Sequence, residues 1–290
     1  MSWITFWIIA MLCFGSWNAF TKKALEKISP KQLTFYRGIV TSIFFLIWIF
    51  FLNFQINFER KFVLIAILLG IVWYIPLLFF YKAVRIWKIW IISPIANSYF
   101  IWTVLFSILF LWEKIWWLQI LSILIIIFWV ILTSINFKDW KNSDVFKLSS
   151  WIPFALLTCI WRWLFFFLSK YPINILWPIL TWFIMEFVIM FSSFVHMKIN
   201  KEKVEITEKN IWTQKKSRLY IFLIWFFGAV WVFSFNIWIT KYNVSLISSI
   251  VWASPIIPII FSKFFYKEHI KKSQYVAVWI ILIWLILISL

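Results

Sequence analysis

Runs of about 20 apolar residues, separated by short polar gaps, follow one another along almost the whole chain. A run of this length crosses the hydrocarbon core of a bilayer as an α-helix, because only a helix bonds all its backbone polar groups internally. The runs lack the alternation of polar and apolar residues that barrel strands show. With 64% hydrophobic and 13% charged residues, a soluble domain is excluded. Ten spans are predicted, at 3–21, 33–53, 62–81, 89–111, 115–136, 150–168, 173–196, 218–238, 244–266 and 273–290.

The ten spans divide into two halves that carry the same landmarks. At offsets of 155 and 148 residues, Glu113 and Trp129 correspond to Glu268 and Trp284, and Gly15 and Lys22 correspond to Trp163 and Lys170. Five spans per half is an odd number, so the two halves must have opposite orientations in the membrane. The predicted fold is an all-α membrane protein of ten transmembrane helices in two inverted five-helix repeats, at 1–136 and 150–290, joined by a connecting loop at 137–149. Such repeats are typical of transporters with a site near the bilayer midplane.

Three segments carry a family resemblance. The first span contains MLCFGSWNAFTKKAL, and the two halves contain SPIANSYFIWTVLFSILFLWE and SPIIPIIFSKFFYKE before their last spans. In this order and at this spacing the segments resemble the EamA-type transporters of the drug/metabolite transporter superfamily. The resemblance implies ten helices, inverted halves, a central cavity and movement of small metabolites without ATP.

Tryptophan and glycine are present in unusual numbers, 25 and 4. Transmembrane helices normally use more glycine, because it lets helices approach closely. Tryptophan stands where the resembled family has glycine, at Trp112, Trp129, Trp252, Trp279 and Trp284. An aromatic belt at the membrane surface does not explain tryptophans deep within spans. We hypothesise that many of these residues are glycine in the organism, encoded by UGA; UGG codons at Trp129, Trp279 and Trp284 would contradict this.

Three ionisable residues lie inside predicted spans, where a charge is costly and indicates function by default. Glu186, near the middle of the seventh span, is a candidate for proton coupling or for binding a substrate ammonium group. The structural alternative is an ion pair of Glu186 with Arg37 or Arg162 that holds helices together. For Arg37 in the second span we expect the guanidinium to extend to the interface, and Arg162 in the sixth also lies within that reach. Binding of a substrate carboxylate is the functional alternative for both arginines.

Neutral polar residues form a second set of candidates for the lining of a cavity. Interhelical hydrogen bonding is the structural alternative for all of them. They are Asn18, Tyr74, Asn97, Ser98, Tyr99, Asn236 and Ser254. Pro94, Pro255 and Pro258 free backbone carbonyls in the fourth and ninth spans, and we predict that they kink these helices and take part in gating.

The predicted function is secondary transport, with export of small metabolites such as amino acids across the cell (inner) membrane by alternating access. No nucleophile–base set, phosphate-binding loop or metal-ligand spacing is present in the sequence, so we expect no enzyme activity, no cofactor and no metal, with proton coupling as an open possibility. The alternative is a membrane-embedded lipid-handling protein or enzyme. The expected partners are a small-molecule substrate and the lipid bilayer, without nucleic acid, for a monomer or homodimer.

The charge distribution predicts the orientation of the chain. The loops after the first, third, fifth, seventh and ninth spans, counted together with Arg218 at the start of the eighth span, hold 20 Lys and Arg residues, and the other loops hold five. The positive-inside rule therefore places both termini outside, whereas the family resemblance implies termini inside. A single cysteine introduced into the 197–217 loop distinguishes the two: modification from the cytoplasmic face supports the charge count, and modification from the outer face supports the resemblance.

Overall fold

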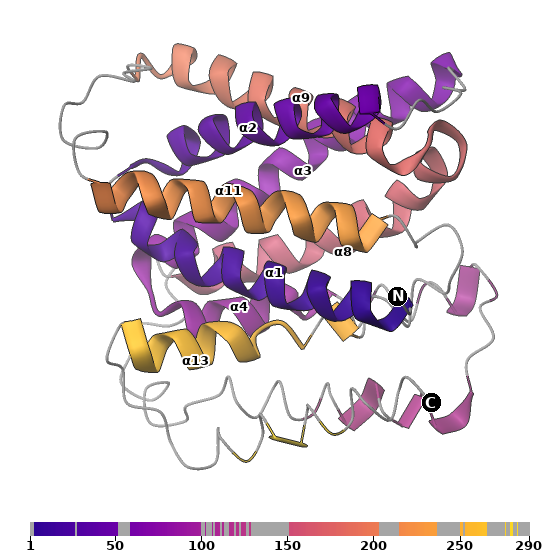
Figure 1. Cartoon of the computed structure of the whole chain (residues 1–290), viewed down its shortest axis with the longest axis vertical. Helices are drawn as coiled ribbons and strands as arrows, with labels where there is room; N and C mark the ends of the chain where they lie inside the picture. The colour runs from indigo at the N-terminus through magenta and orange to yellow at the C-terminus, as the bar shows by residue number, and fades with distance from the viewer. Residues whose placement is uncertain are drawn as a thin grey trace.

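The structure of the chain is a computed structural model. It describes residues 3–26, 28–51, 59–99, 151–202, 215–236 and 253–265, together with scattered positions at 102–128, 250–251 and 276–283. Every secondary-structure element in this described part is an α-helix: α1 (Trp3–Leu25), α2 (Pro30–Phe51), α3 (Arg60–Ile86), α4 (Ile89–Asn97), α8 (Trp151–Leu176), α9 (Pro178–Ile199), α11 (Lys215–Asn236) and α13 (Ile256–Phe265). The longer helices run side by side along a common direction (Figure 1).

Four of the described helices are long and apolar enough to cross a membrane, namely α2, α3, α9 and the part of α8 from Pro153 onward. Their outer faces carry large apolar side chains, with Phe51 80% and Leu64 61% exposed. A soluble protein does not leave so much apolar surface in contact with water. The exposed residues therefore indicate faces that contact lipid. The predicted connecting loop at 137–149 lies outside the described residues.

The turn between α8 and α9 lies later than the sequence predicts. The sixth span was expected to end at residue 168 and the seventh to begin at 173, but α8 continues through Pro172 to Leu176. The chain reverses at Trp177, and Pro178 occupies the first turn of α9, where a missing N–H costs nothing. The Thr181 hydroxyl donates to the Pro172 carbonyl at 3.3 Å and so links the two helices across the turn.

The start of α2 is fixed by a reciprocal cap. The backbone N–H of Ser29 donates to the Gln32 side chain at 2.9 Å, and the backbone N–H of Gln32 donates to the Ser29 hydroxyl at 3.2 Å. This arrangement satisfies two N–H groups that a helix start otherwise leaves unbonded. It begins α2 three residues before the predicted start of the second span.

The most extensive helix contacts join the two halves of the chain. Helix α1 packs along α11, α3 packs along α8, and α2 packs along α9. The predicted repeats make α1, α2, α3 and α4 correspond to α8, α9, α11 and α13. Under this correspondence, exchanging the halves turns the α1–α11 pair into the α8–α3 pair and leaves the α2–α9 pair unchanged. The smaller contacts of α1 with α13 and of α4 with α8 exchange in the same way.

Glycine marks three of the close helix crossings, at Gly15, Gly38 and Gly70. A Cβ added at Gly38 in α2 would lie 2.7 Å from Met190 Cβ and 3.0 Å from Met190 Cα in α9. A Cβ at Gly70 in α3 would lie 2.8 Å from Val188 Cβ and 3.0 Å from the Met185 carbonyl oxygen. These helix backbones approach closely only because glycine has no side chain.

The Gly38 crossing generates a stability prediction. Replacing Gly38 by alanine introduces a methyl group against the α9 backbone, and we expect a loss of about 1–3 kcal/mol in the free energy of unfolding. Thermal unfolding in detergent measures this loss.

The matched control is Gly228→Ala in α11. A Cβ there would meet only Trp17 Cδ1, at 3.9 Å. We expect this substitution to be neutral or to stabilise the helix by up to about 1 kcal/mol. Equal effects of the two substitutions would contradict the role assigned to the Gly38 crossing.

Candidate functional site

An ion pair lies between α2 and α9, away from solvent. Arg37 Nη2 donates to Glu186 Oε2 at 2.8 Å, and the two side chains are 2% and 0% exposed. The Thr41 hydroxyl, one turn after Arg37 on the same face of α2, donates to the same carboxylate oxygen at 3.1 Å. The other carboxylate oxygen, Glu186 Oε1, has no hydrogen-bond partner among the described residues. The pair thus leaves one acceptor available on Glu186.

The expectation that Arg37 extends to the interface is wrong, and Arg162 does not do so either. Both guanidinium groups are buried. Arg37 turns inward because Glu186 offers a counter-charge across the α2–α9 contact, and this outweighs the pull of the membrane surface. The pairing of Glu186 with Arg37, which the sequence left as the structural alternative, is present. The two residues are separated by 149 positions, close to the spacing that the sequence predicts for the repeats, so they occupy matching places in the two predicted halves.

Arg162 in α8 is a second buried cation with a different environment. Arg162 Nη1 donates to Asn97 Oδ1 of α4 at 2.8 Å, while Nε and Nη2 have no partner in the described part of the chain. None of the ion pairs between described residues includes Arg162. Aromatic rings surround the guanidinium instead, with centroids between 4.6 and 5.9 Å from its carbon: Phe14, Trp73, Phe80 and Tyr99. Ring faces attract a cation but neutralise no charge.

Several of the predicted neutral residues are buried inside the bundle. Asn18 in α1, Asn97 in α4, Tyr99 and Ser254 are all buried. Neither polar atom of the Asn18 amide has a partner among the described residues, and the Ser254 hydroxyl has none either. Ser98 instead contacts Cys159 Sγ at 3.2 Å. Asn236 is the last residue of α11, and its side chain lies outside the described part of the structure.

The predicted prolines lie at different places in their helices. Pro94 lies within α4, although its side chain is not among those described. Ala253–Pro255 form a turn before α13, and Pro258 lies in the first turn of that helix. The ninth span therefore contains a break at the predicted position. Gating by these residues stays a prediction.

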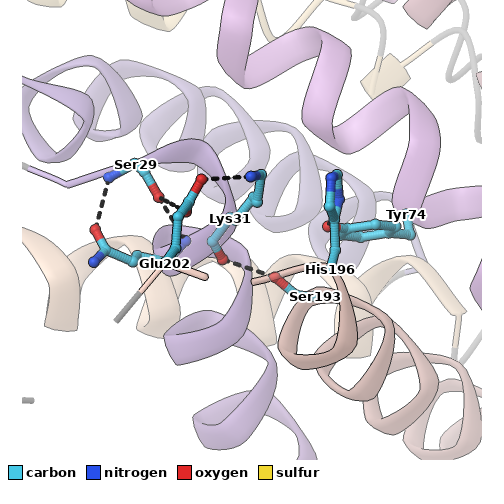
Figure 2. Close-up of polar contacts among 7 residues, drawn as sticks. Ser29, Lys31, Tyr74, Ser193, His196 and Glu202 are labelled. Atoms are coloured by element: carbon cyan, nitrogen blue, oxygen red, sulfur yellow. Dashed lines mark hydrogen bonds and ion pairs between the residues drawn. The ribbon is translucent and has the colours of Figure 1, made fainter. Parts of the chain in front are cut away.

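Tyr74 lies beside a pocket at one end of the bundle, where the starts of α2 and α8 meet the ends of α3 and α9, and it contacts the lining residue His196. A hydrogen bond of 2.8 Å joins the Tyr74 hydroxyl to His196 Nδ1. Glu202 pairs with Lys31 and accepts a hydrogen bond from the Ser29 hydroxyl, as Figure 2 shows. The pocket measures about 440 Å³, and its lining includes Lys31, Lys82, Arg85 and His196 as basic residues but only Glu202 as an acid.

Sequence reasoning missed Thr41 and the aromatic surroundings of Arg162. The position of Thr41 four residues after Arg37 was a usable signal, because residues four apart share a helix face. The rings that meet Arg162 come from α1, α3 and Tyr99, and no local pattern connects them. In the part of the chain that the structure describes, no group of three metal-ligating side chains occurs.

The fold and the buried charges define a multi-pass helical membrane protein with ionisable groups inside its helix bundle. A comparison of the sequence with known families adds to this: residues 1–135 match the EamA-like transporter family. The family resemblance predicted from the sequence is thereby confirmed over these residues.

Solved structures extend the likeness in fold to nearly the whole chain. One of them, described only as "Crystal structure of protein", has a TM-score of 0.76 and 12% sequence identity. The similarity covers 99% of this chain and 96% of that one. At this identity the likeness concerns the fold alone. No curated protein matches the chain.

The buried ion pair generates a stability prediction. Glu186→Ala leaves Arg37 charged and unpaired in a site without water, and we expect a loss of about 3–5 kcal/mol in the free energy of unfolding. The double variant Arg37→Met with Glu186→Met removes both charges and keeps the volume, so we expect a much smaller loss. Thermal unfolding in detergent compares the two.

The control is Glu202→Gln, which breaks the Lys31 pair at the end of the bundle. Because Glu202 is 35% exposed, we expect a change of no more than about 1 kcal/mol. A double variant less stable than Glu186→Ala would refute the account of Arg37 as an uncompensated charge.

Proposed function

We propose that the protein is a secondary transporter that exports small metabolites, such as amino acids, across the cell (inner) membrane. The observation that carries the proposal is the presence of two buried arginines and one buried glutamate inside an apolar bundle. Such groups are expensive in a membrane and are retained where an ion or a charged substrate passes. No phosphate-binding loop appears in the sequence, so the driving force is proposed to be a gradient rather than ATP.

Glu186 is the proposed coupling residue. One oxygen of its carboxylate accepts from Arg37 and Thr41, and the other has no hydrogen-bond partner among the described residues. A proton or a substrate ammonium group arriving at that second oxygen competes with Arg37 for the charge of the carboxylate. Binding would thus weaken the contact between α2 and α9, which are the matching helices of the two halves. This links occupancy of the site to the relative position of the halves.

Arg162 is the proposed anchor for a substrate carboxylate. Two of its nitrogens have no partner among the described residues, and its single strong hydrogen bond goes to the neutral amide of Asn97. A carboxylate is the group that a guanidinium binds best, through two parallel hydrogen bonds. With Glu186 in the same bundle, the centre offers opposite charges to the two ends of an amino acid.

The architecture proposed for this function is ten helices in two inverted five-helix repeats, related by a pseudo-two-fold axis in the membrane plane. The exchange of α1–α11 with α3–α8 supports it, as does the central α2–α9 contact, which maps onto itself. Alternating access then consists of a rocking movement of one repeat against the other around a fixed midplane site.

Transport in proteoliposomes tests these assignments. Glu186→Gln keeps the shape of the side chain but removes its charge, so we expect loss of transport driven by a pH gradient. Arg162→Gln should raise the half-saturating concentration of a carboxylate substrate about 10–100-fold, the value of a hydrogen bond to a charged group.

Arg162→Lys, which keeps the charge without the paired donors, should recover part of this loss. Glu202→Gln at the end of the bundle serves as the control and should transport normally. The assays are run on the chain as written and on one with glycine at the tryptophan positions that the sequence identifies. Unchanged transport and pH dependence in Glu186→Gln would eliminate the coupling role.

A further inference from the structure

Tryptophan occupies backbone conformations that favour glycine. Among the described residues, three that are not glycine have positive φ, and two of them are tryptophan: Trp112 at 53° and Trp177 at 81°. With ψ at 139°, Trp177 lies in a region that a side chain with a Cβ rarely adopts. None of the described glycines has positive φ. The conformation typical of glycine is thus found at tryptophan positions.

The centre of the bundle is filled by indole rings. Trp17, Trp73, Trp182 and Trp231 are each no more than 2% exposed and are among the largest fully buried side chains. Trp17 and Trp231 stack with ring centroids 5.9 Å apart, and Trp182 meets Trp231 edge to face at 6.3 Å. Trp17 also lies 5.8 Å from the guanidinium carbon of Arg37, and Trp73 lies 5.5 Å from that of Arg162. These rings occupy the space around both buried arginines.

The polar groups around the rings are poorly satisfied. The indole N–H groups of Trp182 and Trp231 have no hydrogen-bond partner among the described residues, although a buried tryptophan normally finds one. The Asn18 amide and two nitrogens of Arg162 also have no hydrogen-bond partner among the described residues. Buried polar groups without partners need an explanation. An indole N–H only donates, so the rings that pack beside Arg37 and Arg162 cannot accept a hydrogen bond from these guanidinium groups.

We propose that Trp17, Trp73, Trp112, Trp177, Trp182 and Trp231 are glycine in the protein as its organism makes it, because UGA codons are read there as glycine. Two independent observations carry this: backbone angles at two positions, and the filled but unsatisfied centre at the other four. Glycine at the four central positions opens a cavity between Arg37 and Arg162. That this cavity takes a small carboxylate rests on the proposed function, whereas the identity of the residues does not.

Peptide sequencing of the protein purified from its own organism tests the identities directly. One peptide that spans Trp177 and Trp182 covers a position assigned from its backbone angle and a position assigned from the filled centre. We expect glycine at both positions and UGA at both codons. Tryptophan in the native peptide, or UGG at either codon, would overturn the proposal whatever the outcome of any transport assay.

Unfolding temperatures test the backbone argument in the chain as written. Trp177→Gly should raise the unfolding temperature by several degrees, because glycine adopts a φ of 81° without strain. Trp177→Ala removes the same ring but keeps a Cβ, so it should gain less. The matched control is Trp117→Gly, at a helical position 71% exposed, which should lower the temperature. A gain for Trp177→Ala equal to that for Trp177→Gly would contradict the assignment.

Thiol labelling tests the cavity. Cys159, one helical turn before Arg162, is buried and unbonded to another cysteine. With Cys13 replaced by serine, a small water-soluble thiol reagent should modify Cys159 at least tenfold faster when all four central tryptophans are glycine. The Trp117→Gly variant should label as slowly as the unaltered chain. Equal protection of Cys159 in the folded four-glycine variant would refute the cavity, while loss of transport with an open cavity would count against the proposed function alone.

Discussion

The ion pair of Arg37 with Glu186 is the interaction on which the arrangement of the bundle depends. In the apolar interior neither charge tolerates separation from the other, since each would then be a buried ion without a counter-charge. The pair therefore fixes the rotation of α2 and α9 about their own axes. Gly38, the residue after Arg37, sets how closely the same helices approach. One short stretch of α2 thus supplies both the attraction and the clearance of the contact between the halves.

The same contact makes the separation of the two charges depend on how the helices lie. The charges face each other across α2 and α9, so a shift of α2 against α9 changes their separation directly. The hydrogen bonds at the end of the bundle behave differently. Ser193 of α9 donates to the Lys31 carbonyl at the start of α2 at 2.8 Å, near the Lys31–Glu202 pair. The α2–α9 contact is therefore held at its middle by charge and at one end by polar groups that water can replace.

The sequence predicts the large features because they follow from local patterns. Apolar runs longer than a bilayer is thick can only be spanning helices, and the described helices lie in those runs. Glu186 was identified because a carboxylate in such a run is conspicuous. The environment of Arg162 was not predictable, because its rings come from separate helices and tertiary packing alone brings them together. The turn at Trp177 was misplaced for a related reason: Lys170 and Pro172 are the usual signals of a helix end, whereas a tryptophan gives no sign of a reversal.

The reversal at Trp177 shows what a closely packed helix bundle requires of its sequence. Chain reversals between closely packed helices need a residue free of steric limits on φ, and close crossings need a residue without a side chain. Both requirements recur along a helical membrane protein, and four glycines are too few to meet them. The structure meets the first with tryptophan at positive φ and fills the centre with indole rings beside unpaired polar groups. Trp17 and Trp73 pack directly against the buried guanidinium groups of Arg37 and Arg162. The excess of tryptophan over glycine therefore concerns function as well as composition, because the proposed transport of a substrate requires space at the position that these rings occupy.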